Sequence, residues 1–150
     1  MVKTLIVYDS LYGSTERIAK AIGGAITDEV KVVRPGEANP TGLESIGLLI
    51  VGSPTHGGRQ TVATREFISK IPANSLKNVR VTSFDTRIKA KWVKIFGYAA
   101  GRIADSLVDK GGTLVVPPEG FFVKSTRGPL EEGELERAAA WARGILESKK

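Results

Sequence analysis

Short apolar runs alternate along this chain with stripes of apolar residues at helical spacing. Unbroken apolar runs or alternating stretches predict five strands, at residues 5–7, 29–33, 46–51, 79–84 and 113–116. Stripes at helical spacing predict four helices, around residues 18–26, 63–71, 96–107 and 135–146. Residues 119–129, after Pro117 and Pro118, are expected to be irregular. The alternation of strand and helix predicts an α/β fold, with a five-stranded parallel sheet and helices on both faces.

A hydroxyl-rich turn separates the first predicted strand from the first predicted helix. Ser10, Tyr12, Ser14 and Thr15 bring four hydroxyls into six residues around Gly13. A helix that begins here points unpaired backbone N–H groups and its positive dipole end into the turn, so fixed donors would hold a phosphate without a lysine. The alternative is that Ser14 or Thr15 is only an N-cap. A cap needs one hydroxyl, and the excess favours a ligand.

Two further turns follow the third and fourth predicted strands. Residues 52–58, GSPTHGG, are too rich in glycine for a strand or a helix, and residues 85–94 are expected to form a loop. The carboxyl ends of parallel strands meet at one edge of a sheet, so we expect these loops to lie beside the first turn. A plain tight turn is the alternative interpretation of the glycine-rich segment.

Composition narrows the chemistry that this chain can perform. Its 150 residues, 41% of them hydrophobic, suffice for a single domain with a buried core over residues 1–150. The absence of cysteine excludes disulfides, thiolate metal sites and cysteine nucleophiles. With His56 as the only histidine, neither a serine–histidine triad nor a multi-histidine metal site is expected, so we assign no catalytic and no metal-binding residues. Redox work would require a bound organic cofactor.

Charge and hydropathy bear on partners and location. The chain carries 22 basic and 16 acidic residues, a net charge of +6, but no sequence pattern of a nucleic-acid-binding module. No apolar run reaches the length of a membrane span, and the N-terminus lacks the pattern of a signal peptide. We therefore expect a cytoplasmic protein that binds neither nucleic acid nor membrane.

The first turn resembles the phosphate loop of the flavodoxins. That loop has the pattern hydroxyl residue, any residue, hydroxyl residue, Gly, any residue, Thr, which here is Ser10, Leu11, Tyr12, Gly13, Ser14 and Thr15. Tyr12 stands where Ser or Thr is usual, a variation similar to the flavodoxin modules of flavodiiron proteins and related quinone reductases. The resemblance implies a flavodoxin-like, doubly wound sheet of order 2-1-3-4-5 and FMN as the cofactor.

The second turn resembles the flavodoxin loop beside the flavin ring, through Pro54, Thr55, His56, Gly57 and Gly58. In that family, a peptide bond of this loop turns over when the flavin gains one electron. Glycine suits such a change because it accepts positive φ. The resemblance leaves open whether His56 stacks on the ring or is exposed.

The third turn resembles a segment of a short flavodoxin subgroup, through Phe84, Asp85, Thr86 and Arg87. Its backbone N–H groups would hold the flavin pyrimidine, and Arg87 would face the ring or solvent. Trp92 is expected to anchor this loop on the core or, as the alternative, to cover the flavin.

The resemblance implies an FMN-binding electron carrier that acts between protein redox partners. The same fold hosts enzymes, so an FMN-dependent NAD(P)H:quinone reductase or a related small flavin oxidoreductase is the main alternative, and a non-redox interaction module is the third. Familiar flavodoxins are acidic, whereas residues 87–94 carry four cations here. This basic segment is either a solvated face or a docking site for an acidic partner.

Overall fold

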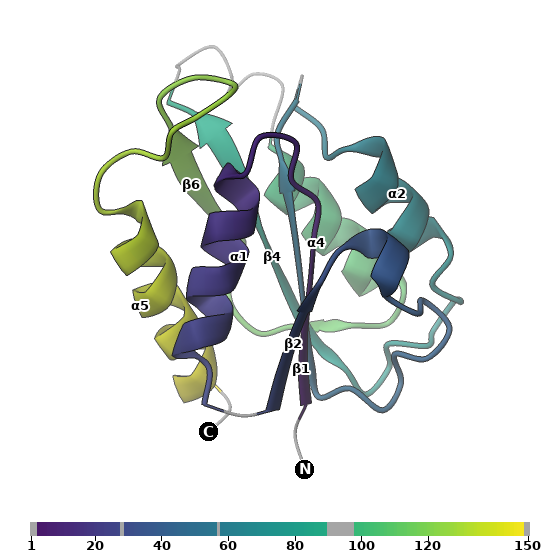
Figure 1. Cartoon of the computed structure of the whole chain (residues 1–150). Coiled ribbons are helices and arrows are strands. Elements are labelled where there is room, and N and C mark those ends of the chain that lie inside the picture. The colour runs from purple at the N-terminus through teal and green to yellow at the C-terminus, as the bar shows by residue number, and fades with distance from the viewer. Residues whose placement is uncertain (1–2, 28, 57, 90–97, 149–150) are drawn as a thin grey trace.

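The computed structural model describes residues 3–27, 29–56, 58–89 and 98–148 and shows a parallel sheet between two layers of helices (Figure 1). The strands are β1 (Lys3–Tyr8), β2 (Glu29–Val33), β3 (Leu48–Pro54), β4 (Arg80–Ile88), β5 (Thr113–Leu114) and β6 (Glu119–Val123). The helices are α1 (Ser14–Ala25), α2 (Val62–Ser69), α4 (Ala99–Asp109) and α5 (Glu134–Glu147), with a short 3-10 turn η1 (Pro35–Glu37).

The sheet has the order β2-β1-β3-β4-β5, and every pairing between its strands is parallel. This confirms the predicted topology. In the register of the central strands, Ile6 of β1 lies between Val32 of β2 and Ile50 of β3. The unbroken apolar run in β3 is buried because β3 lies inside the sheet and has helices over both of its faces.

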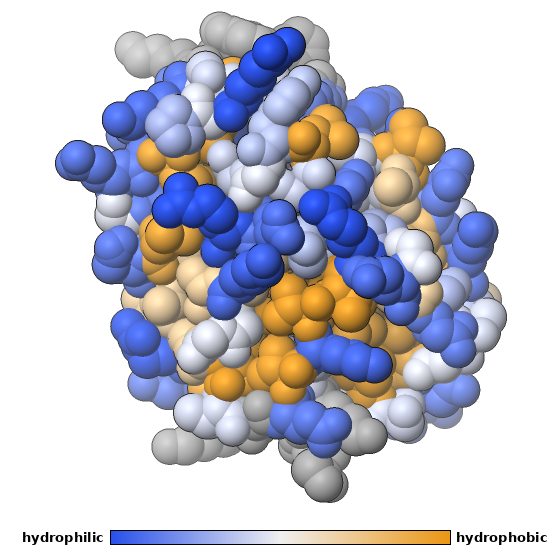
Figure 2. All heavy atoms as spheres, in the orientation of Figure 1, coloured by the Kyte–Doolittle hydropathy of each residue, from blue (hydrophilic) through white to orange (hydrophobic). Residues whose placement is uncertain are grey.

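One apolar core lies on each face of the sheet. α1 and α5 cover one face, and α2 and α4 cover the other (Figure 1). Successive side chains of a strand point to opposite faces, so Ile6 belongs to the first core and Val7 to the second. The predicted helical stripes supply the other half of each core, for example Ile18 under α1 and Phe67 under α2. β2 is an outer strand, and Figure 2 shows apolar surface along it.

β4 is longer than the sequence predicts. The expected loop from Asp85 is wrong for its first four residues, since Asp85 to Ile88 continue the strand. Thr86 pairs with Pro54 of β3 on one side and with Phe121 of β6 on the other. The backbone groups of these residues therefore belong to the sheet rather than to an open turn. Residues 90–97, which include Trp92 and the expected start of the third helix, lie outside the described residues.

A second correction concerns residues 119–129, which were expected to be irregular. Residues 119–123 form β6, which pairs with residues 84–88 of β4 on the same side as β5. β5 and β6 occupy the same place in the sheet, one after the other. Between them, the four residues 115–118 lie opposite only Thr82 and Ser83 of β4, so this segment has two more residues than the stretch of β4 beside it. Pro117 and Pro118 cannot donate ladder hydrogen bonds, which is why the strand is interrupted there.

The chain reverses directly after β6 and forms a short antiparallel ribbon. The Lys124 N–H donates to the Pro129 carbonyl at 2.9 Å, and the Glu131 N–H donates to the Phe122 carbonyl at 2.9 Å. A turn over residues 125–128, which we call the ribbon tip, closes the ribbon. Because β6 runs parallel to β4, this tip lies at the carboxyl edge of the sheet.

The first turn of α5 anchors this ribbon. Glu134 is buried, and its carboxylate accepts hydrogen bonds from the Phe122 N–H at 2.8 Å and from Arg137 Nη2 at 2.6 Å. The Arg137 guanidinium also donates to the Gly120 carbonyl of β6. Burial by itself would raise the pKa of Glu134, but the hydrogen bonds from Arg137 and the Phe122 N–H outweigh it and lower that pKa.

We predict that Glu134→Gln destabilises the protein by about 1 to 3 kcal/mol at pH 7, because the neutral amide forms weaker bonds to Arg137 and Phe122. Since folding lowers the pKa of Glu134, its contribution is present above the unfolded pKa of about 4.3 and is lost as the pH falls through the folded pKa. Urea unfolding at a series of pH values should therefore show the variant and the wild type converging in acid.

Glu136→Gln is the matched control, because it removes an exposed carboxylate from the same helical turn. Its stability should follow the wild-type pH profile. A constant difference between Glu134→Gln and the wild type from pH 7 to acid would contradict this account of Glu134.

Candidate functional site

The turns after β1 and β3 and the end of β4 meet at the carboxyl edge of the sheet, at the top of Figure 1. They surround a hollow with about 380 Å³ of free space, part of it open to solvent. Of the described residues, the predicted site residues that line it are Ser10, Leu11, Tyr12, Ser14, Thr15, Pro54, Thr55, His56, Thr86 and Arg87. Ile88, Val123 and Thr126 complete the lining, and our sequence interpretation missed all three.

The N-terminus of α1 opens into the first turn without a side-chain cap. Gly13 is the N-cap residue with φ of 99°, and among the described residues no side chain caps this helix. The interpretation of Ser14 or Thr15 as the N-cap is therefore wrong. The Ser10 hydroxyl instead accepts a hydrogen bond from the Gly13 N–H at 3.1 Å. The first N–H groups of α1 have no partner within the helix, so they are available to an anion.

The hydroxyls of the first turn have different surroundings. Thr15 is buried, and its Oγ1 lies 2.8 Å from Thr86 Oγ1, which ties the start of α1 to β4. Ser14 lies against the ribbon tip, where a Cβ on Gly128 would be 2.8 Å from the Ser14 hydroxyl oxygen. Tyr12 is half exposed. Thr15 therefore stabilises the turn, while Ser14 and Tyr12 remain beside the hollow.

Glu16 places a carboxylate in the first turn of α1, where it could repel an anion. Its carboxylate accepts a hydrogen bond from the Tyr8 hydroxyl at 3.0 Å and lies 3.3 Å from Lys20 Nζ and 3.8 Å from Arg34 Nη2. The Tyr8 hydrogen bond, followed by that of Lys20, lowers the pKa of Glu16. Arg34 also donates to the Ser10 carbonyl at 3.2 Å, so cations offset this carboxylate at the edge of the turn.

The expectation that residues 52–58 form no strand is wrong for Gly52 to Pro54, which continue β3. The second turn is a tight reversal between His56 and Arg59. The backbones of His56 and Arg59 exchange two hydrogen bonds, of 2.8 and 3.0 Å. Gly58 has φ of 79°, in the left-handed region that favours glycine, which explains a glycine at this position. Arg102 of α4 donates through Nε to the Gly58 carbonyl at 2.8 Å. His56 is exposed at the hollow, Gly58 is buried outside the lining, and Gly57 lies outside the described residues.

Phe84 lies beneath the hollow, in the core. Its side chain is fully buried and makes edge contacts with the rings of Phe121 and Trp141, each with a centroid distance of 6.2 Å. A Cβ on Gly52 would be 2.0 Å from the Phe84 ring, so the ring packs directly on the β3 backbone. Phe84 therefore supports the site from below and does not line it.

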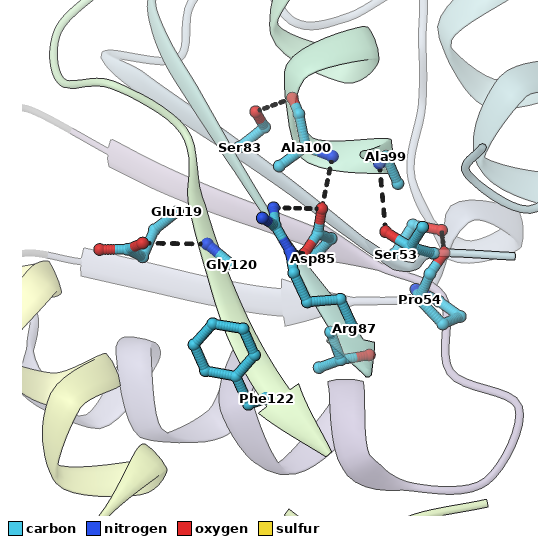
Figure 3. Close-up of polar contacts among 12 residues, drawn as sticks. Ser53, Pro54, Ser83, Asp85, Arg87, Ala99, Ala100, Glu119, Gly120 and Phe122 are labelled. Carbon is cyan, nitrogen blue, oxygen red and sulfur yellow. Dashed lines mark hydrogen bonds and ion pairs between the residues drawn. The ribbon is translucent and has the colours of Figure 1, made fainter. Parts of the chain in front are cut away.

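Asp85 also lies beneath the hollow and is completely buried (Figure 3). Its carboxylate accepts two hydrogen bonds from Arg87, of 2.7 and 2.8 Å, and one from the Ala100 N–H at 2.9 Å. The Arg87 guanidinium lies 3.5 Å from the centroid of the Tyr98 ring. Arg87, which was expected to face a ligand ring or solvent, therefore binds Asp85 inside the protein and only borders the hollow.

The second turn is fixed to the same helix. The Thr55 hydroxyl accepts a hydrogen bond from the Ala99 N–H at 3.1 Å. Thr55 and Asp85 thus bond to successive N–H groups at the start of α4, which has no cap from its own N-cap residue, Tyr98. This arrangement aligns the ends of β3 and β4 below the hollow.

The lining of the hollow is both polar and apolar. Hydroxyls and the α1 N-terminus provide polar groups, while Leu11, Pro54 and Ile88 provide apolar surface. Leu11 and Ile88 are 53% and 38% exposed, so their apolar surface is accessible to a ligand. Among the described residues, no cluster of three or more histidine or acidic side chains could hold a metal, and no described helix is long and apolar enough to cross a membrane. The arrangement suits a planar apolar group that carries an anion.

Solved structures resemble this chain over nearly its whole length. A flavodoxin from the domain Archaea is 21% identical, with a TM-score of 0.81, and the match covers 99% of this chain and 100% of that one. Flavodoxin 2 from Bacillus cereus is 24% identical, with a TM-score of 0.82, and the match covers 97% of this chain and 99% of that one. These TM-scores, over nearly the whole length of both chains, show a shared fold.

A larger protein contains a similar domain, and a family model matches the sequence itself. Rubredoxin oxygen:oxidoreductase from Desulfovibrio gigas is 22% identical, with a TM-score of 0.72, over 98% of this chain but 37% of that chain. No curated protein matches the chain. Residues 5–95, more than half of the chain, match the family model described as a flavodoxin domain. The chain therefore belongs to the flavodoxin domain family.

Proposed function

We propose that residues 1–150 form one FMN-binding domain that carries electrons between protein redox partners. The observation that carries this proposal is that the α1 N-terminus and the apolar side chains of Leu11 and Ile88 meet at one hollow. Membership of the flavodoxin family supports the same conclusion. When bound, FMN supplies the one-electron chemistry, and the chain supplies binding and orientation.

The hydroxyl-rich first turn and the start of α1 fit the phosphate of FMN. The unpaired N–H groups of the first turn of α1 are fixed donors, and the Ser14 hydroxyl adjoins them. The Ser10 hydroxyl accepts from the Gly13 N–H and retains its own hydrogen to donate. Charge on the phosphate is also stabilised by the positive end of the helix dipole.

The apolar side chains of the lining fit the flavin ring. Leu11, Pro54 and Ile88 would cover parts of the ring, and His56 is exposed where it could stack on it. The Asp85 carboxylate is fully engaged by Arg87 and the Ala100 N–H, so it holds the floor of the site and does not take part in proton transfer. Apart from the paired Arg87, the titratable side chains that line the hollow are Tyr12 and His56. No carboxylate is among the described lining residues, which favours a carrier over an enzyme with its own acid–base chemistry.

We predict that the purified protein binds FMN more tightly than riboflavin by tenfold or more. Ser14→Ala should lower FMN affinity by about 1.5 to 3 kcal/mol, through loss of a hydrogen bond to a charged group, and should leave riboflavin affinity unchanged. Quenching of flavin fluorescence measures both affinities. Ser45→Ala, at an exposed serine outside the hollow, is the matched control and should change neither.

Three outcomes would contradict parts of this proposal. No binding of FMN would remove the cofactor and leave a non-redox interaction module. Equal losses of FMN and riboflavin affinity in Ser14→Ala would mean that the turn supports the fold and does not bind phosphate. Steady consumption of NAD(P)H with a quinone, by the purified protein alone, would favour the quinone reductase.

We also propose that the redox partners are acidic, although the structure changes which cations support this. Arg87 is paired with Asp85, and Lys89 lies in a hollow that also contains Glu131 and Glu134. Lys91 and Lys94 lie outside the described residues. Support comes instead from exposed Arg59, on the turn that carries His56 to the hollow.

We predict that Arg59→Glu slows electron transfer to an acidic [2Fe–2S] ferredoxin by about tenfold at low salt, because a cation near the site of contact steers an acidic partner toward it. Stopped-flow rates at several ionic strengths measure the effect, which should vanish at high salt. Lys77→Glu makes the same charge change at an exposed residue near the amino end of β4 and should have little effect. If the rate of electron transfer from the wild-type protein did not depend on salt, Arg59 would be only part of a solvated face and not a docking residue.

A further inference from the structure

The ribbon tip, residues 125–128, forms a fourth side of the hollow that the sequence analysis did not anticipate. Thr126 lines the hollow together with Ser10, Ser14 and Thr15 of the first turn. Gly128 has φ of 89°, and a Cβ there would be 2.8 Å from the Ser14 hydroxyl oxygen. Both its backbone conformation and this close approach require glycine. The ribbon tip therefore packs directly against the start of α1.

Arg127 brings a cation to Tyr12, a residue of the lining, although Arg127 itself does not line the hollow. Its guanidinium carbon lies 5.6 Å from the centroid of the Tyr12 ring, within the range of a cation–π contact. Tyr12 occupies the position where the flavodoxin pattern has Ser or Thr, and neither of those side chains has a ring that could hold a guanidinium. The tyrosine and the arginine thus form a pair across 115 residues of sequence.

The ribbon tip is held in position before any ligand binds. The Ser125 hydroxyl donates to the Gly128 carbonyl at 2.7 Å, and the Gly128 N–H donates to the Ser125 carbonyl at 2.9 Å. Below the tip, the bonds between Lys124 and Pro129 close the ribbon, and Glu134 holds the Phe122 backbone. A group presented by such a turn loses little conformational freedom when it binds.

We propose that the ribbon tip is a second phosphate-binding element of the FMN site, in which Arg127, held on the Tyr12 ring, and the Thr126 hydroxyl donate to the phosphate. The proposal rests on FMN binding, as argued above, and assigns residues to it from outside the three turns. In this chain, the pair of Tyr12 and Arg127 takes the place of the hydroxyl that the flavodoxin pattern has at residue 12. Because Arg127 is exposed, salt should weaken its contribution.

The test compares the FMN and riboflavin affinities of four single variants and one double variant at low and high salt, by quenching of flavin fluorescence. Arg127→Gln should weaken FMN binding about tenfold at low salt, leave riboflavin binding unchanged, and reduce the salt dependence of FMN binding. Lys124→Gln removes an exposed cation from the same ribbon, outside the hollow, and should match the wild type.

The Tyr12 variants test whether the ring acts through Arg127. Tyr12→Phe retains the ring and should retain FMN selectivity. Tyr12→Ser restores the hydroxyl of the family pattern but removes the ring, and we expect it to weaken FMN binding. That loss should be smaller when Arg127→Gln is already present, since the two side chains would act as one unit.

Four results would overturn the proposal. They are an unchanged FMN affinity in Arg127→Gln, an equal loss of FMN and riboflavin affinity, an equal FMN loss in Lys124→Gln, and strict additivity of Tyr12→Ser with Arg127→Gln. Each leaves FMN binding by the wild type intact, so each contradicts the role of the ribbon tip alone. Absence of FMN binding by the wild type would instead overturn the proposed function and this proposal together.

Discussion

The buried ion pair between Asp85 and Arg87 determines much of the structure around the hollow. Asp85 has no exposed surface, and burying an unpaired carboxylate would cost several kcal/mol. Three donors satisfy it, two from Arg87 and one from the Ala100 N–H. These bonds fix the end of β4 against the start of α4. Loss of Arg87 would leave the charge buried and unpaired, which typically costs about 3 to 5 kcal/mol.

The same ion pair constrains residues on the neighbouring strand and helix. A Cβ on Gly120 of β6 would be 2.2 Å from the guanidinium carbon of Arg87, so only glycine fits opposite the ion pair. On the other side, the Tyr98 ring packs on that guanidinium at 3.5 Å. The guanidinium is thus enclosed between a strand and a helix start, and the floor of the hollow is rigid. Loops can then present binding groups above a fixed base.

Hydrophobic periodicity in the sequence predicts most of the helices and strands correctly. The prediction is wrong where the buried residues of an element are polar. Asp85 and Thr86 are buried because their polar atoms are paired, with Arg87 and Thr15, and a hydropathy pattern cannot reveal such pairing. The prediction therefore ended β4 at Phe84. β6 was missed because the two prolines before it suggested irregular structure, although its buried Phe121 and Val123 alternate as strand residues do.

The site shows the same division between local and long-range information. The three turns could be brought together from sequence because each follows a predicted strand, and parallel strands end at one edge. The positions of Thr126 and Arg127 could not be predicted in this way. They depend on the pairing of β6 with β4 and on the reversal of the chain after β6. The one available signal was the alternation of apolar residues after the two prolines. It would have predicted a parallel strand there and placed the turn that follows the strand at this edge of the sheet.

The surplus of hydroxyls in the first turn supports a ligand less directly than the sequence suggested. Thr15 is bonded to Thr86, and Ser10 accepts from the Gly13 N–H, so two of the four hydroxyls also hold the turn in shape. What remains for an anion is the uncapped start of α1 together with the Ser14 hydroxyl and the hydrogen of the Ser10 hydroxyl, a set of donors with no cation among them. The two carboxylates nearest to this turn, Asp9 and Glu16, are near Arg34. Fixed N–H donors can hold a phosphate without a cation, so any positive charge that faces it comes from outside this turn, and Arg127 on the ribbon tip, beside the Tyr12 ring, is the cation that we propose for that role.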